Sequence, residues 1–381
     1  MTLLKKGFRF LASYELSIVL LALLLVVVFL GTVEQARIGL YAAQENYFYS
    51  LVAWFPQGAP VASPLPGGYL LSVLLCVNLL CGGLLAAPKR WRRPGLLIGH
   101  AGVLMLMGAG FVSFHLADEG HVTLFEGQSS DRMVSYHEWQ LQVTEPGPEG
   151  RRFILSQDRI EDTPPYQWKD FTHPDLPFTL RTGLYLPNAR PVMESTSAAD
   201  GVALVPERPA ENRESNLPGI TLRLEGPGAS VVDGIVWAGE QAPWVAEVAG
   251  KQYVIQLARR SWPLPFTLRL DTFTHERHPG TSIPATFSSA LTVREAGAER
   301  QVDIRMNAPF RHRPHTFFQA SWGPQDAREG EPLYSVLAVT RNPAEDWPMH
   351  ASLVISAGLL LHFVQALLAH LRAEAKRRAA P

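Results

Sequence analysis

The chain has 381 residues, of which 47 % are hydrophobic and 18 % are charged, and its formal net charge is −1. A chain so close to neutral offers no extended basic surface, which excludes nucleic acid as an expected partner. The motifs GxxxxGKS/T, H-E-x-x-H and C-x-x-C-H are absent, as is the G-x-S-x-G nucleophile elbow. The sequence therefore does not indicate an ATPase or a hydrolase that acts alone.

Four apolar segments predict four transmembrane helices, at residues 16–33, 69–87, 96–114 and 351–369. Each is close to the roughly 20 apolar residues that a bilayer core requires. Short segments rich in Lys and Arg stay on the cytoplasmic side, and here they are residues 1–15, the loop 88–95 and the tail 370–381. We therefore predict that both termini lie in the cytoplasm and that residues 34–68 and 115–350 are exported.

Several residues in and around these helices predict how they pack. Six aromatic residues between positions 41 and 55 are typical of a membrane interface, and they predict a short interfacial helix within residues 34–68. In the third helix, small residues share one face and predict close packing with this chain's own helices or with a partner. These small residues are Gly95, Gly99, Gly102 and Ala109. The two cysteines, Cys76 and Cys81, point to different faces of the second helix, so we expect no disulfide between them.

Residues 115–350 change to short runs in which apolar and polar residues alternate between Gly and Pro turns. Examples are FTLRTGLYL at 178–186, KQYVIQLA at 251–258 and FTLRLDTF at 266–273. Alternation with a period of two predicts antiparallel strands, and a segment this long can bury its own core. We predict an exported all-β domain, like a sandwich or a barrel, with a long loop or an insertion at Met193 to Pro218 between two β halves.

Two ionisable residues lie inside the predicted transmembrane segments, His100 in the third and His362 in the fourth. An ionisable group in a bilayer is costly, so each is a candidate functional residue. At about 1.5 Å per residue, His100 lies about 8 Å and His362 about 12 Å from the cytoplasmic end of its helix. Two neutral imidazoles at similar depth are what axial ligation of a haem iron would require. The alternative is that each one hydrogen-bonds a carbonyl or hydroxyl group and only packs.

Other histidines carry weaker signals. The spacing H-x-x-H occurs twice, in His275 with His278 and in His312 with His315. On a strand or a turn this spacing does not bring both nitrogens to one side, so hydrogen-bonded surface histidines are favoured over a metal site. His115 and His350 lie where two predicted helices leave the membrane on the outer side, and an outer haem or ligand site there is a further hypothesis.

Two neighbouring segments, LPFTLRLDTFTHERHPGTSIPATFSSALTV and RQVDIRMNAPFRHRPHTFFQASW, resemble the signature of the ResB-type (CcsB-like) cytochrome c biogenesis family. The matching positions are Pro279, Gly280, Pro284, Phe287, Ser288, Met306, Asn307, Pro309, Phe318 and Gln319. His278 stands where the family usually has Tyr, and Ala320 interrupts a Gln-Ser pair. The layout of three helices, a large exported β-rich domain and a last helix also matches, so the resemblance covers nearly the whole chain.

The resemblance implies one half of the System II cytochrome c maturation machinery in the bacterial cytoplasmic membrane. That machinery moves haem to the outer face and attaches it to the thiols of exported apocytochrome c. The expected partner is a ResC/CcsA-type membrane protein. By the resemblance, His100 is expected to ligate a transient haem b, with His362 or a histidine of the partner as the second ligand. The chain is expected to be an accessory half and not an enzyme on its own.

Alternatives remain open for the function and for the motif. The chain is also consistent with a non-haem membrane scaffold or chaperone whose β domain binds exported proteins. A thiol-redox function through Cys76 and Cys81 is disfavoured by their diverging faces. The motif between Met306 and Trp322 is also consistent with a folding signature, since Pro, Asn and aromatic residues in a β turn usually have structural roles.

Overall fold

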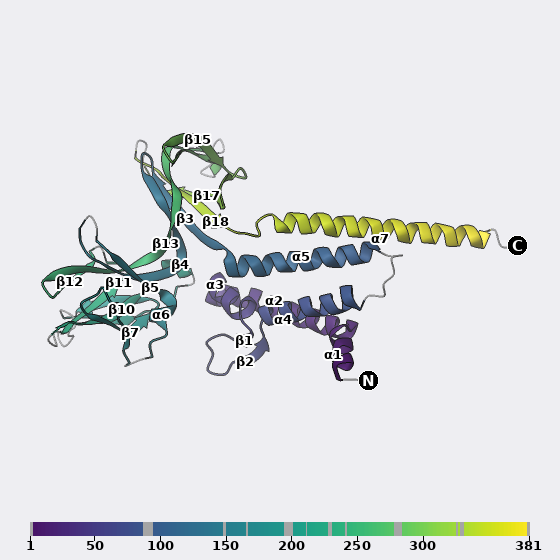
Figure 1. Cartoon of the computed structure of the whole chain (residues 1–381), viewed down its shortest axis with the longest axis horizontal. Helices are drawn as coiled ribbons and strands as arrows, with labels where there is room; N and C mark the ends of the chain where they lie inside the picture. Colours follow the sequence, from purple (N-terminus) through teal and green to yellow (C-terminus); the bar gives the residue numbers. More distant parts are fainter. Residues whose placement is uncertain are drawn as a thin grey trace. The chain divides into compact units, whose positions relative to one another are not determined.

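The computed structural model describes residues 3–86, 94–147, 150–164, 167–193, 201–210, 212–227, 231–240, 242–277, 284–324, 327 and 331–378. The chain forms two compact units. The helical unit consists of Met1–Asp118 and Arg341–Pro381, and the β unit consists of Glu119–Thr340. Figure 1 shows both units and labels most of their helices and strands.

The helical unit is built from helices and one short hairpin. In chain order it contains α1 (Leu3–Leu11), α2 (Tyr14–Ile38), α3 (Leu40–Ala43), the π-helical turn η1 (Gln44–Phe48), the hairpin strands β1 (Val52–Phe55) and β2 (Ser63–Pro66), α4 (Gly68–Asn78), the π-helical segment η2 (Leu79–Leu85), α5 (Pro94–Leu116) and α7 (Trp347–Arg378). Four of these are long and apolar enough to cross a membrane, namely α2, α4 continued by η2, α5 and α7. Three of them, α2, α5 and α7, extend beyond the predicted apolar segments at both ends, because flanking polar residues continue the helix.

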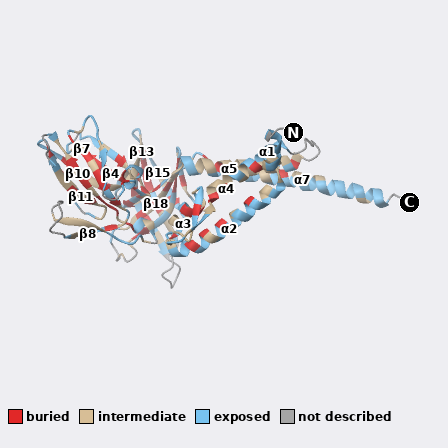
Figure 2. Ribbon diagram, turned by 90° about the horizontal axis from the view of Figure 1, so that it is seen from below, coloured by how far each residue is buried: buried red, intermediate tan, exposed pale blue. Residues whose placement is uncertain are grey.

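These four helices are only partly covered by the chain itself. Between 11 and 22 % of each apolar window is buried, and Figure 2 shows exposed residues along α2 and α7. So much exposed apolar surface would be unfavourable in water. The helices are therefore consistent with a multi-pass membrane protein.

The helices α2 and α4 pack through a small apolar core and one polar link. Leu20 and Leu71 are buried in this core. Asn78, at the end of α4, is 4 % exposed, and its side-chain oxygen accepts a hydrogen bond from Ser17 at 2.6 Å. Its amide nitrogen donates to two backbone carbonyls at the junction of α1 and α2, one of them that of Ser13 at 3.1 Å. Asn78 thus ties the start of α2 to α4.

One ring of the aromatic segment between α2 and α4 is buried inside the helical unit. Tyr47 in η1 is fully buried, and its hydroxyl donates to Glu34 of α2 at 3.2 Å. Arg37 holds the same carboxylate at 2.9 Å. The short helical stretch α3–η1 is present as expected, but this ring fixes it to α2, because Glu34 provides a hydrogen-bond acceptor inside the unit.

The helices α5 and α7 run antiparallel along a seam lined by glycines. The facing pairs are Gly95 with His362, Gly99 with Gly358, and Gly102 with Ile355. A Cβ atom on Gly95 would lie 2.5 Å from the backbone nitrogen of His362, so no side chain fits there. The glycine face of the predicted third helix therefore packs against this chain's own last helix.

The β unit is almost entirely antiparallel sheet. In chain order it contains β3 (Asp118–Phe125), β4 (Ser129–Thr144), β5 (Arg152–Ser156), α6 (Gln157–Glu161), β6 (Lys169–Phe171), β7 (Thr179–Leu186), β8 (Ala189–Met193), β9 (Val202–Pro206), the 3-10 turn η3 (Arg213–Ser215), β10 (Gly219–Glu225), β11 (Val231–Trp237), β12 (Trp244–Val248), β13 (Lys251–Arg277), β14 (Pro284–Glu295), β15 (Ala298–Arg305), β16 (Phe310–His312), β17 (His315–Gly323) and β18 (Tyr334–Arg341).

Two hydrophobic cores lie in the β unit, and the long strands β4 and β13 contribute to both. The first core includes Leu222 and Ile255 and is covered by the four-stranded sheet β11-β10-β7-β6. The second core includes Leu268 and Phe317 and lies inside the ten-stranded sheet, whose main path is β15-β14-β13-β4-β3-β18-β17-β16. Side chains of β14 and β17 meet across this sheet, so it curls until it is nearly closed.

Two strand boundaries differ from the prediction. The runs at 251–258 and 266–273 form one strand, β13, because the prolines between them lie where the register against β4 shifts, between Pro263 and Leu268. Proline cannot donate to the ladder and is tolerated at such a break. The segment expected to be a loop after Met193 also contains a strand, since Met193 of β8 pairs with Val202 of β9. Residues 194–200 lie outside the described residues.

Candidate functional site

The His100 side chain lies between α5 and the π-helical segment η2. Its Nδ1 atom is 3.2 Å from the carbonyl oxygen of Gly83. A Cβ atom on Gly83 would lie 3.0 Å from the same Nδ1 atom. The imidazole therefore contacts the backbone of η2 directly. A side chain at position 83 would crowd the ring, so the glycine allows this contact.

The hydrogen bond determines which tautomer of His100 is present. A carbonyl oxygen only accepts, so Nδ1 carries the proton and donates it to Gly83. In a neutral imidazole the lone pair then lies on Nε2, which is the arrangement that metal-bound histidines usually have. The same bond also fits the alternative that His100 only packs. The two interpretations differ in what Nε2 binds.

His362 lies in the seam between α5 and α7. The backbone of His362 contacts Gly95 in the seam. His100 follows Gly95 by five residues, which turns it about 140° around the helix at 100° per residue. The His100 ring is thus directed toward η2, whereas the backbone of His362 lies in the seam with α7. Haem ligation by either residue stays a prediction.

The other singled-out histidines each have separate surroundings. His115 accepts or donates a hydrogen bond of 2.9 Å with the Tyr69 hydroxyl, and His350 is exposed at the start of α7. His275 stacks on Trp322 with ring centroids 4.3 Å apart. Among the described residues no group of three or more His, Cys, Asp or Glu side chains is placed to hold a metal ion.

The pair His312 and His315 faces across the β16–β17 hairpin. His312 bonds to Glu295 through Nε2 at 2.9 Å, and His315 is 6 % exposed. Both rings pack near Phe266, with ring centroids 4.8 Å away for His312 and 6.0 Å away for His315. Directly opposite residues of an antiparallel pair point to the same face, so the hairpin brings both rings to one side, in contrast to the spacing argument. His278 lies outside the described residues.

The motif residues divide into turn, core and surface positions. Pro279 and Gly280 lie outside the described residues, and Pro284 begins β14. Phe287 packs against the second core, and Ser288 pairs with Thr274 and Arg305 on the two neighbouring strands. Met306 and Asn307 form the turn after β15, where Asn307 has a positive φ of 61°, and Pro309 precedes β16. Phe318 is 39 % exposed on β17.

Gln319 is the motif residue with the most internal contacts. Its side-chain oxygen accepts from Ser289 at 2.6 Å, and its nitrogen donates to Ser335 at 2.9 Å. Ser289 and Ser335 are fully buried and hydrogen-bond each other at 2.8 Å. This triad joins β14, β17 and β18, which supports a folding role for this part of the motif. Sequence reasoning missed both serines, although Ser289 lies on the same inward face of β14 as Phe287 and Leu291, which are two residues away on either side.

A second group that sequence reasoning missed surrounds Arg259 on β13. Its guanidinium donates to the backbone oxygen of Tyr136 at 2.6 Å and stacks on Trp139 at 4.0 Å. The ring of His121 lies 4.6 Å from that of Tyr136. Burial, with the positive charge of Arg259 adding to it, lowers the pKa of His121. The imidazole is therefore held neutral in this part of the β unit.

Comparison with known proteins agrees with the motif. A model of the ResB-like family matches residues 231–331, from β11 to beyond β17. All ten motif positions lie within this range, so the resemblance drawn from them is confirmed. No curated protein gives a significant match. The ResB-like family is associated with cytochrome c biogenesis, and over residues 231–331 this chain is similar to that family.

Proposed function

We propose that the chain is the membrane subunit of a System II cytochrome c maturation complex. In this role it lies in the bacterial cytoplasmic membrane with both termini inside, and it works with a ResC/CcsA-type partner. Together they move haem to the outer face and attach it to exported apocytochrome c. The observation that carries the proposal is the ResB-like match over residues 231–331, joined in one chain to four helices suited to a membrane.

In this proposal haem is cargo, and His100 is the residue that holds it near the cytoplasmic side. Its Nδ1 atom is committed to the Gly83 carbonyl, which leaves Nε2 as the lone-pair nitrogen. The second axial ligand comes from the partner, because the His362 backbone lies in the seam between α5 and α7, whereas the His100 ring is directed toward η2. A neutral imidazole suits this depth, because a charged group in lipid is much more costly.

The β unit has the task of holding apocytochrome c near the haem, which is catalysis by positioning. It contains no cysteine, and the two cysteines of the chain, Cys76 and Cys81, are free and lie in α4 and η2. Reduction of the apocytochrome thiols is therefore assigned to other proteins.

The test is cytochrome c maturation in cells that carry the full complex with His100→Ala. We expect covalent haem on exported cytochrome c to fall at least tenfold while both subunits accumulate normally, because the loss of one axial ligand removes the haem from its path. His370→Ala, in the basic C-terminal tail, is the matched control and should mature cytochrome c normally.

The scaffold function is the second candidate. The Ser289–Gln319–Ser335 triad, whose two serines are buried, favours it, since that part of the motif serves folding. Under this function the β unit binds exported protein without any haem contact by the chain. Normal maturation in the His100→Ala strain would select the scaffold function and reject the haem-conduit role.

A further inference from the structure

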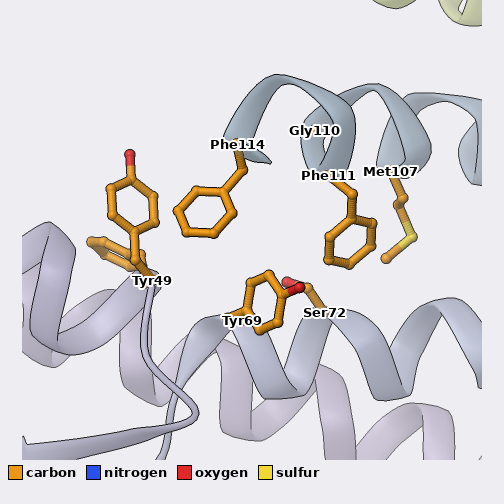
Figure 3. A pocket seen from close by; sticks show the side chains of 8 residues that line it. Tyr49, Tyr69, Ser72, Met107, Gly110, Phe111 and Phe114 are labelled. Atoms are coloured by element: carbon orange, nitrogen blue, oxygen red, sulfur yellow. The ribbon is translucent and has the colours of Figure 1, made fainter. Parts of the chain in front are cut away.

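A partly open cavity of about 250 Å³ lies in the helical unit between α4, α5 and η1, and neither the family motif nor His100 uses it. Figure 3 shows aromatic side chains facing it from both helices, with Tyr69 on α4 and with Phe111 and Phe114 on α5. Tyr49 and Phe48 complete one side. The cavity is at the end of the unit where α4 begins and α5 ends.

The rings are arranged so that a flat molecule can stack on them. Tyr69 lies 5.6 Å from Phe111 at an interplanar angle of 86° and 5.5 Å from Phe114 at 45°. Tyr49 lies 5.0 Å from Phe114, again at 45°. Edge and face surfaces are therefore both presented, which favours a conjugated ring over a flexible chain.

Two hydroxyl groups give the cavity a polar side. Tyr69 and Ser72 are three residues apart on α4, so their side chains lie on one helix face, and both line the cavity. The Tyr69 hydroxyl is 2.9 Å from Nε2 of His115. When Nε2 carries the proton and donates it, the phenol hydrogen is available to donate to an acceptor in the cavity.

The volume of the cavity and the glycine at position 110 restrict which ligands can bind there. Cavities for drug-sized ligands measure about 300–1,000 Å³, so this one suits a head group of one or two rings and does not enclose a whole porphyrin. A Cβ atom on Gly110 would have no atom within 4 Å, so the glycine leaves its side of the cavity open. Met107 adds a polarisable thioether to the wall.

We infer that this aromatic cavity binds the head group of a lipid-soluble quinone. The ring packs by its face or its edge against Tyr69, Phe111 and Phe114, and a quinone oxygen accepts a hydrogen bond from Tyr69 or Ser72. A lipid acyl chain would fill the apolar part but offers no acceptor to either hydroxyl. Binding alone is inferred, with no electron transfer to residues of the chain.

The test uses the full chain in phosphatidylcholine nanodiscs, titrated with ubiquinone-1 by calorimetry. We expect saturable binding of one molecule per chain. Gly110→Phe fills the cavity and should weaken binding at least tenfold. Tyr69→Phe keeps the ring but loses a hydrogen-bond donor, and should weaken it about fivefold. Gly108→Phe is the matched control, since Gly108 also faces open space but lies two residues away, on another face of α5.

Farnesol, an isoprenoid alcohol without a quinone ring, separates ring recognition from binding of an apolar tail. The inference predicts that farnesol does not compete with ubiquinone-1. It is overturned if farnesol competes equally, if Gly110→Phe binds as well as the wild type, or if no saturable binding occurs. A change in Gly108→Phe as large as that in Gly110→Phe would also overturn it, because it would reflect damage to α5.

Discussion

The two helix pairs of the helical unit are held together by opposite means. The α5–α7 pair is joined by backbone contact, with a Cβ on Gly358 falling 2.5 Å from the Gly99 nitrogen. The α2–α4 pair is joined through side chains, with Asn78 hydrogen-bonded to Ser17 and to backbone carbonyls at the start of α2. Where two backbones are in contact there is no room for an added atom. A side chain that only forms hydrogen bonds can be replaced, and the loss of stability is then limited to those bonds. The pair that carries both membrane histidines is therefore the less tolerant one.

The largest effect is expected when a methyl group enters the glycine seam. Gly358→Ala should lower the free energy of unfolding in mixed micelles by about 3 kcal/mol, because the two backbones must separate. Gly99→Ala makes the same chemical change on the facing helix, where the added Cβ has no atom within 4 Å, and should raise stability by up to about 1 kcal/mol through helix propensity. Equal changes in stability from the two substitutions would contradict the close backbone packing at Gly358.

Removing a buried hydrogen bond should lower stability less than adding a methyl group to the glycine seam. The Ser289–Gln319–Ser335 triad of the β unit allows this to be measured. Gln319→Ala leaves the Ser289 and Ser335 hydroxyls without their amide partner, so unfolding by urea should show a loss of about 2 kcal/mol. Gln301→Ala is the control, because Gln301 is an exposed residue on β15, and it should change stability by less than about 0.5 kcal/mol. Similar losses from both would mean that the triad adds nothing.

Asn78→Leu tests the polar link between α2 and α4. Hydrogen bonds between membrane helices contribute about 0.6 kcal/mol on average and about 1.7 at most. We expect a loss within this range in mixed micelles, and a smaller loss for Ser17→Ala, which removes one of the three bonds. A larger loss of stability in Ser17→Ala than in Asn78→Leu would contradict the central role of Asn78 in joining the two helices.

The smallest effect is expected at a half-exposed ion pair, and it depends on pH. The hydrogen bond from His312, with Arg313 nearby, lowers the pKa of Glu295 below its usual 4.5. A carboxyl group with a lowered pKa stabilises the fold above its unfolded pKa, and this contribution is lost as the pH falls through the folded value. Glu295→Gln should therefore lower the melting temperature at pH 7 and leave it unchanged near pH 3. A difference that persists at pH 3 would contradict this.

The sequence predicts the helices and the kind of sheet well, because both depend on local patterns. Four apolar segments and the alternating runs follow from composition along the chain. The buried position of Tyr47 does not, since it depends on Glu34 lying across from it. Likewise, the prolines near Pro263 predict a strand end, but a register shift against β4 absorbs them within one strand.

The candidate site could be predicted only as individual residues. Placing an ionisable side chain in a bilayer is energetically costly, and this argument identifies His100 and His362 from the sequence alone. The contact of His100 with Gly83 joins two helices, and the placement of His362 in the seam depends on the packing of a third, so neither is present in a local pattern. The same holds for the cavity at Tyr69, whose walls come from η1, α4 and α5.

The most direct test of the haem role is the visible absorption spectrum of the complex purified from membranes, as wild type and as His100→Ala, at equal yield of both subunits. We predict a Soret band in the wild type that is lost or shifted in the variant, because the proposal makes Nε2 of His100 an axial ligand. Identical Soret bands in both samples would contradict the account and would leave this chain as a scaffold for apocytochrome c.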